Sequence, residues 1–178
     1  VGPPNGSDLD RIIKTKNGQI GLLTSFILEF FRQLREEYDA GLTYVTGDGG
    51  DKALPDLTPA KPISDDSELV DYIIRENSFL SLEQVARITG LSAESIRRSV
   101  RDRLRMYPET DPASKYVHFL VYERGVNFLF EGEDRNRFFF WSTTPFYSLE
   151  FFRYAMNCPA DQKARYDLYR TFLEALEP

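Results

Sequence analysis

The sequence predicts a mainly helical fold that contains one or two short parallel strands. Apolar residues recur every three or four positions through most of the chain, which is the spacing of one helix face. Only residues 42–45 form a short apolar segment typical of a strand, and they run into a turn rich in Gly and Asp. With 178 residues the chain is long enough for one domain that has its own core.

The N-terminal part of the chain predicts one long helix after a loop. Residues 1–18 are rich in Pro, Gly and Asn, with a short helix expected at 8–13 that Ser7 caps. Residues 20–38 are predicted to form an amphipathic helix. Its apolar face consists of Ile20, Leu23, Phe26, Ile27, Phe30, Phe31 and Leu34.

Residues 52–62 contain three prolines and are expected to be extended. A helix with an acidic start is predicted from residue 64 to about residue 77. Residues 81–106 form a distinct unit with the pattern of a helix-turn-helix, in which Ser81 and Ser92 cap the two helices. The second of these helices carries the arginines Arg97, Arg98, Arg101, Arg103 and Arg105.

Aromatic residues dominate the C-terminal third of the chain. Residues 115–130 have helical spacing, and a dense charge run follows at 131–137. Residues 138–147 are largely aromatic and do not alternate, so they are expected to be buried on several sides. Two more helices are predicted, one at 149–157 behind the cap Ser148 and one that begins at Asp161.

The composition narrows the class of protein. A content of 42% apolar residues indicates a globular chain, and a net charge of −6 argues against a general nucleic-acid-binding surface. Cys158 is the only cysteine and His118 the only histidine, which excludes an internal disulfide and a multi-histidine metal site and suits a cytoplasmic setting. No apolar run approaches the ~20 residues of a membrane span. The chain begins without Met, and we expect a fragment.

The strand at 42–45 raises a question of pairing. It is the one confident strand in the sequence, and its backbone groups need partners if they are buried. The sequence therefore leaves two alternatives: the segment is the edge of a sheet supplied from elsewhere, or it is not a strand.

The turn after this strand offers the clearest chemistry. Gly47, Gly49 and Gly50 permit a positive φ and a close approach of the backbone, and amides in such a loop can cradle phosphate. Asp48 and Asp51 are hard oxygen ligands that suit Mg²⁺. An ordinary surface turn uses the same residue types, so both readings stay open.

Two further clusters could carry chemistry, but each has a simpler explanation. The acids and arginines of 131–137 could hold a substrate, but we expect an ion-pair network at a helix end. The arginines of the helix-turn-helix-like unit could contact DNA phosphates, but we expect them to be solvated or paired with acids. His118 is expected to be partly buried with a partner, and Cys158 is not expected to be a nucleophile.

Residues 42–51, Leu-Thr-Tyr-Val-Thr-Gly-Asp-Gly-Gly-Asp, resemble the second signature of the asparagine synthase family. Residues 134–147 resemble that family's Asp-Arg region with its following Pro-Phe, and residues 153–159 resemble a helix that ends in a Pro-containing turn. Residues 163–170 resemble the segment with the family's final Lys-x-x-x-Arg. The resemblance extends from about residue 20 to the end.

The resemblance implies the helical C-terminal half of an α/β adenine nucleotide alpha-hydrolase-like domain. Such a synthetase domain activates a carboxylate with ATP as an acyl-adenylate, and ammonia then forms the amide. Asp48 matches the catalytic acid that faces the acyl substrate, and Asp51 matches the Mg²⁺ and pyrophosphate ligand. Gly47, Gly49 and Gly50 would shape the loop that binds the nucleotide. The implied cofactors are ATP and Mg²⁺.

Departures from the family pattern bear on the reaction. The first signature, a Ser-Gly-Gly-x-Asp-Ser pyrophosphate loop, is absent from these residues, and so is a glutaminase domain. Tyr166 stands where the family has a catalytic lysine, with Lys163 and Arg165 as substitutes to consider, and Lys52 stands where Glu is usual. Residues 81–106 have no counterpart in the general pattern.

We therefore predict that residues 1–178 are part of an ATP-dependent amide-forming ligase that is inactive as this fragment. The expected partners are a small carboxylate substrate and the rest of the synthetase domain or an upstream glutaminase domain, with no membrane. The sequence leaves open a homodimer. The alternative is a non-catalytic helical interaction or DNA-binding module built on residues 81–106. The ligase hypothesis requires that the Gly/Asp loop lies against the aromatic C-terminal segment.

Overall fold

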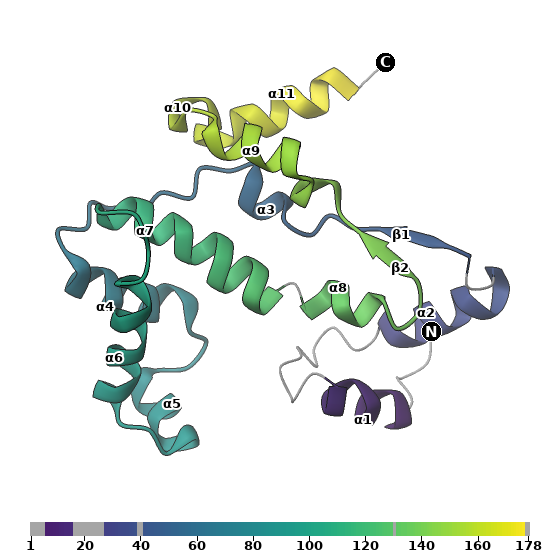
Figure 1. The fold of residues 1–178 in the computed structure, drawn as a ribbon, viewed down its shortest axis with the longest axis horizontal. Coiled ribbons are helices and arrows are strands. Elements are labelled where there is room, and N and C mark those ends of the chain that lie inside the picture. The colour runs from purple at the N-terminus through teal and green to yellow at the C-terminus, as the bar shows by residue number, and fades with distance from the viewer. Residues whose placement is uncertain (1–5, 16–26, 39–40, 130, 177–178) are drawn as a thin grey trace. The chain divides into compact units, whose positions relative to one another are not determined.

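The fold is mainly helical and contains a two-stranded parallel sheet, as predicted (Figure 1). A computed structural model describes residues 6–15, 27–38, 41–129 and 131–176. The chain divides into two compact units. Unit 1 comprises Val1–Asp56 and Arg124–Pro178, and unit 2 comprises Leu57–Glu123.

Unit 1 begins with two helices, α1 (Gly6–Thr15) and α2 (Ile27–Tyr38). The short helix expected at 8–13 is thus somewhat longer. Of the helix predicted at 20–38, residues 20–26 lie outside the described residues. The buried face of α2 is offset from the predicted one. Leu28 and Phe31 are 1% and 0% exposed, whereas Phe30 is 41% exposed.

The strand predicted at 42–45 is β1 (Thr43–Val45), and its partner lies within this chain. It pairs in parallel with β2 (Trp141–Thr143), with Tyr44 opposite Ser142. The Thr46 amide continues the ladder to the Thr143 carbonyl at 2.9 Å. The alternative that this segment is not a strand is wrong, because it pairs with a strand hidden in the aromatic run.

Aromatic rings join α2 to this sheet. The ring of Phe31 meets that of Tyr44 edge-on at a centroid distance of 5.0 Å and that of Phe140 at 5.5 Å. Such edge-to-face pairs stabilise a core by about 0.5–1.5 kcal/mol each beyond the area they bury. Burial in the predicted aromatic run is uneven, since Phe140 is 4% and Trp141 67% exposed.

The rest of unit 1 consists of short elements. The charge run begins with a helix, α8 (Glu131–Asn136), and the Gly/Asp loop leads into α3 (Gly50–Ala53). After β2 come η3 (Pro145–Tyr147), α9 (Leu149–Asn157), α10 (Ala160–Lys163), η4 (Ala164–Tyr166) and α11 (Asp167–Leu176). The single helix expected from Asp161 is wrong, because Arg165 and Tyr166 have left-handed backbone angles that separate α10 from α11.

Unit 2 contains α4 (Asp66–Asn77), α5 (Leu82–Thr89), α6 (Ala93–Leu104) and α7 (Pro112–His118). The predicted caps are present: Ser81 and Gln84 form a capping box on α5, and Ser92 caps α6. Its core comprises Leu69, Val70, Ile73, Leu104, Tyr107, Tyr116 and Leu120. Beyond α7 the chain continues as a π-helical segment, η2 (Phe119–Leu129), where an α-helix was expected.

Among the described residues, none of the helices combines the length and the apolar character that crossing a bilayer requires.

Candidate functional site

The parallel pairing of β1 and β2 brings together the two stretches of the chain that carry the candidate functional residues, which are the loop after β1 and the segment around β2. Both strands point the same way, so the Gly/Asp loop after β1 and the segment after β2 meet at one edge of the sheet. Thr144 fixes this meeting, since its hydroxyl donates to the Asp48 carbonyl at 2.5 Å.

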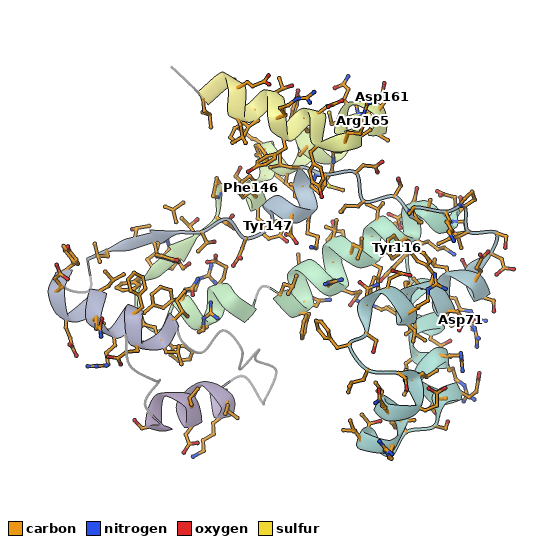
Figure 2. The ribbon with its side chains drawn as sticks, turned by 180° about the vertical axis from the view of Figure 1, so that it is seen from behind. Asp71, Tyr116, Phe146, Tyr147, Asp161 and Arg165 are labelled. Atoms are coloured by element: carbon orange, nitrogen blue, oxygen red, sulfur yellow. The ribbon has the colours of Figure 1, made fainter. Side chains whose placement is uncertain are left out.

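Two glycines of the loop lie directly under aromatic rings. A Cβ on Gly49 would stand 2.7 Å from the Tyr147 ring, and one on Gly50 would stand 3.0 Å from the Phe146 ring. Figure 2 shows Phe146 and Tyr147 beside α3, which begins at Gly50. The loop therefore lies against the aromatic C-terminal segment, as the ligase hypothesis requires.

Only one of the three loop glycines has a positive φ. Gly49 adopts φ 89°, whereas Gly47 and Gly50 lie outside the left-handed region. Of the three glycines that permit a positive φ, only Gly49 uses it. Gly50 is needed for the close approach of Phe146, and a Cβ on Gly47 would meet nothing within 4 Å.

Several backbone amides of the loop already donate within it. The Gly50 amide donates to the Gly47 carbonyl at 3.1 Å, and the amides of Lys52 and Ala53 donate to the Gly49 carbonyl at 3.0 and 2.9 Å. These bonds make a tight turn into the four-residue α3. Because these donors are engaged, they do not form a phosphate cradle in this conformation.

The side chain of Asp48 meets a buried acid from the charge run. Glu133 is 0% exposed and accepts hydrogen bonds from the hydroxyls of Thr46 and Ser142. Burial, a hydrogen bond to Glu133 and repulsion from its charge raise the pKa of Asp48 to about 6, against an opposing effect of Arg135. Asp48 therefore keeps its proton to a higher pH than a solvated aspartate does.

Helix α8 supplies this buried acid together with further polar groups. The Arg135 guanidinium donates to the Asn136 side chain at 3.2 Å, and Asn136 donates to the Ser142 hydroxyl at 3.4 Å. Arg135 and Asn136 are 8% and 2% exposed, so this part of the charge run is buried. Arg137 lies on the outside, 5.5 Å from the ring of Trp141.

Asp51 lies apart from this pair and faces solvent. Its side chain is 66% exposed, and one carboxylate oxygen accepts from the ammonium group of Lys52, whose side chain is 8% exposed. Within the described ranges, no three His, Cys, Asp or Glu side chains are grouped so as to hold a metal ion. Mg²⁺ commonly uses one or two carboxylates with phosphates and waters, so a single exposed carboxylate fits that role.

A cavity of about 330 Å³ opens next to Asp51 and is bordered by Gly47, Gly50 and Tyr166. The residue at the position of the family's lysine therefore reaches the loop. The two proposed substitutes do not line this cavity: Lys163 is buried, which lowers its pKa, and the Arg165 side chain is 89% exposed near Asp167.

Sequence reasoning missed the hydroxyl residues that hold the site together. Thr46 and Thr144 each directly follow a strand, Ser142 is the middle residue of β2, and all three bond to Glu133 or to the loop backbone. The signal for Ser142 and Thr144 was a run of Ser and Thr before a proline in the aromatic segment, and Thr46 opens the Gly/Asp motif. That signal is weak because hydroxyl residues are common at turns.

Most arginines of α6 are paired with acids, as we expected. Arg97 pairs with Asp71 at 3.0 Å, and the other pairs join Arg101 to Glu94, Arg103 to Glu123 and Arg105 to Asp102. His118 has the expected partner, Glu109 at 3.0 Å, and stacks on Tyr107 at 3.9 Å. The Cys158 thiol donates to Gln162 at 3.3 Å.

Comparison with protein-family models, with curated proteins and with solved structures finds no match for this chain. The case for a function therefore rests on the residues and their geometry.

Proposed function

We propose that this chain is part of an ATP-dependent amide-forming ligase of the asparagine synthase type. In this proposal it forms the helical C-terminal half of an α/β adenine nucleotide alpha-hydrolase-like domain in the cytoplasm. One observation carries the proposal. The two stretches that resemble the family, residues 42–51 and 134–147, are remote in sequence but share one sheet edge and contact each other.

The acid pair gives Asp48 a role in proton transfer. A pKa of about 6 leaves Asp48 mainly ionised at neutral pH but still able to accept a proton. A nucleophilic amine loses a proton when it attacks an activated carboxylate, and a base with a pKa near the working pH suits that step. Thr46 and Ser142 hold Glu133 in place, and Glu133 in turn tunes Asp48.

Asp51 would hold Mg²⁺ in this scheme, and the metal would neutralise charge on the pyrophosphate leaving group. Its exposed carboxylate leaves room for phosphates and waters, and the buried Lys52 orients it through the second oxygen. The loop glycines shape this part of the site through their packing beneath Phe146 and Tyr147.

Tyr166 changes what the site can do relative to the family. A phenol can donate a hydrogen bond to a developing oxyanion, but it does not carry the fixed positive charge of a lysine. We therefore propose amide formation as the reaction class and do not propose asparagine as its product.

The test is an ATP–pyrophosphate exchange assay on the full-length gene product with a panel of carboxylic acids. Asp51→Asn is expected to lower exchange by about 100-fold or more, since it removes a charge that acts in the transition state. Asp102→Asn, on the surface of unit 2, is the matched control and is expected to leave exchange unchanged. Absence of acid-dependent exchange, or equal rates in the two variants, would overturn the proposal.

A second candidate function is supported by the geometry of residues 81–106. A capping box, a left-handed Gly90 at φ 72° and a capped second helix together form a helix-turn-helix. The acids that pair with the arginines of α6 reduce the positive charge that these arginines would offer to DNA phosphates. Salt-sensitive binding of duplex DNA that disappears in Arg97→Ala/Arg101→Ala would favour this candidate over the ligase.

A further inference from the structure

The cavity beside the Gly/Asp loop has mainly aromatic and apolar walls. Three of its sides are the aromatic rings of Phe146, Tyr166 and Tyr169, and Leu54 and Pro55 add apolar surface. Its volume of about 330 Å³ lies near the lower end of the range for small-molecule sites, which is roughly 300–1,000 Å³. The cavity therefore suits a small ligand with an apolar body.

The backbone adopts an uncommon conformation at one of these three aromatic residues, Tyr166, and at its neighbour Arg165. Arg165 and Tyr166 have φ of 55° and 62°, in the left-handed region that side chains other than glycine rarely adopt. Such a conformation persists only where its surroundings enforce it. Gly50, which also lines the cavity, lets the Phe146 ring approach the loop more closely than a Cβ would allow.

The polar lining of the cavity is anionic. Among the described residues that line it, Asp51 is the one charged residue and none is Lys, Arg or His. Lys52 binds the Asp51 carboxylate, yet the Asp51 side chain remains 66% exposed. Aromatic ring faces attract cations, and a neighbouring carboxylate adds to that attraction. An anionic ligand would find no cationic side chain on these walls.

We propose that this cavity binds a small organic ammonium ion that carries an apolar group. The inference goes beyond the ligase proposal and needs neither ATP nor Mg²⁺, because it rests on the rings and on Asp51.

Choline and 3,3-dimethylbutan-1-ol form a suitable pair of probes, since they have nearly the same shape and differ in charge. Each is titrated into the 178-residue chain, and binding is followed by changes in protein NMR chemical shifts. Choline is expected to bind about 2- to 30-fold more tightly than the neutral alcohol, which is the range for a cation on aromatic faces. Equal affinities, or no shift changes with choline, would overturn the proposal.

Variants then locate the site. Tyr166→Ala is expected to weaken choline binding by about 2- to 30-fold and Tyr166→Phe to retain it, because the ring face makes the contact. Asp51→Asn is expected to weaken it by about two- to fivefold, as for an exposed charge pair. Tyr154→Ala, which removes an exposed tyrosine of α9 outside the cavity, is the control.

An unchanged choline affinity in both Tyr166→Ala and Asp51→Asn would refute the assignment of the cation to this cavity. If Tyr166→Ala does not fold, the comparison of choline with the alcohol on the unmodified chain still decides the question. Failure of ATP–pyrophosphate exchange with intact choline binding would reject the ligase and keep the cation site. The reverse outcome would reject the cation site alone.

Discussion

Replacing Asp48 by Asn is expected to stabilise unit 1 at neutral pH, although it removes our best candidate for a catalytic residue. Asp48 lies next to Glu133, which is fully buried and held by two hydroxyl donors. At pH 7.5 the ionised Asp48 repels Glu133 and has lost water through burial. An amide of nearly the same shape carries no charge and can still donate a hydrogen bond to Glu133.

The sign and size follow from the raised pKa. The pKa of Asp48 rises from 3.8 to about 6, so the folded chain holds a proton that the unfolded chain releases, and stability falls as the pH rises through this interval. Converted in full, such a pKa shift would lower the free energy of unfolding by about 3 kcal/mol. Because Asp48 is partly exposed, screening by solvent reduces this loss to about 1 kcal/mol. Asp48→Asn should therefore raise the free energy of unfolding by about 1 kcal/mol at pH 7.5 and leave it unchanged near pH 4.

Urea unfolding at the two pH values measures this difference. Trp141 is the only tryptophan and lies on β2, so its fluorescence reports on the sheet of unit 1. The matched control is Asp161→Asn on the exposed surface of α10, which is expected to change stability by less than about 0.5 kcal/mol at either pH. A gain that does not depend on pH, or a loss of stability at pH 7.5, would refute the account of the acid pair.

Three further predictions concern the fold. Gly49→Ala should destabilise unit 1 by about 1–3 kcal/mol in urea, because its Cβ would strike the Tyr147 ring at 2.7 Å and its φ is 89°. Gly47→Ala, with open space around it, should change stability by less than about 0.5 kcal/mol, and equal effects would contradict the packing. Ser81→Ala should cost about 1 kcal/mol through loss of the α5 cap, measured by thermal unfolding followed by circular dichroism. Leu69→Ala should cost about 2–5 kcal/mol in urea, whereas truncation of the exposed Leu91 should cost much less.

The helices were predictable where local chemistry determines them. Ser81, Gln84 and Ser92 cap the helices of unit 2 as their spacing indicates, because a capping bond connects residues only two or three positions apart. The strand β2 was not predictable in the same way. It has three residues, and its pattern of one buried Ser between exposed neighbours has meaning only once β1 lies beside it.

The candidate site was predicted as two separate clusters. Asp48 was assigned from the loop motif and Glu133 from a charge run, with nothing in the sequence to connect them. Their contact depends on the parallel register of β1 with β2 and on α8, which turns Glu133 and Asn136 inward from one face. Long-range pairing of this kind is set by the packing of the whole unit and not by local propensity.

The structure also changes which residues support the ligase proposal. Glycines in a loop suggest phosphate binding when no other reason for them is known. Here Gly49 and Gly50 have such a reason, because the rings of Tyr147 and Phe146 occupy the space of their missing side chains. The proposal consequently depends on the acids and on their positions: Asp48 paired with a buried Glu133, and Asp51 exposed at an anionic, aromatic cavity. Under the ligase proposal Asp48 would serve as the base and Asp51 as the Mg²⁺ ligand, and both lie in the loop at this sheet edge.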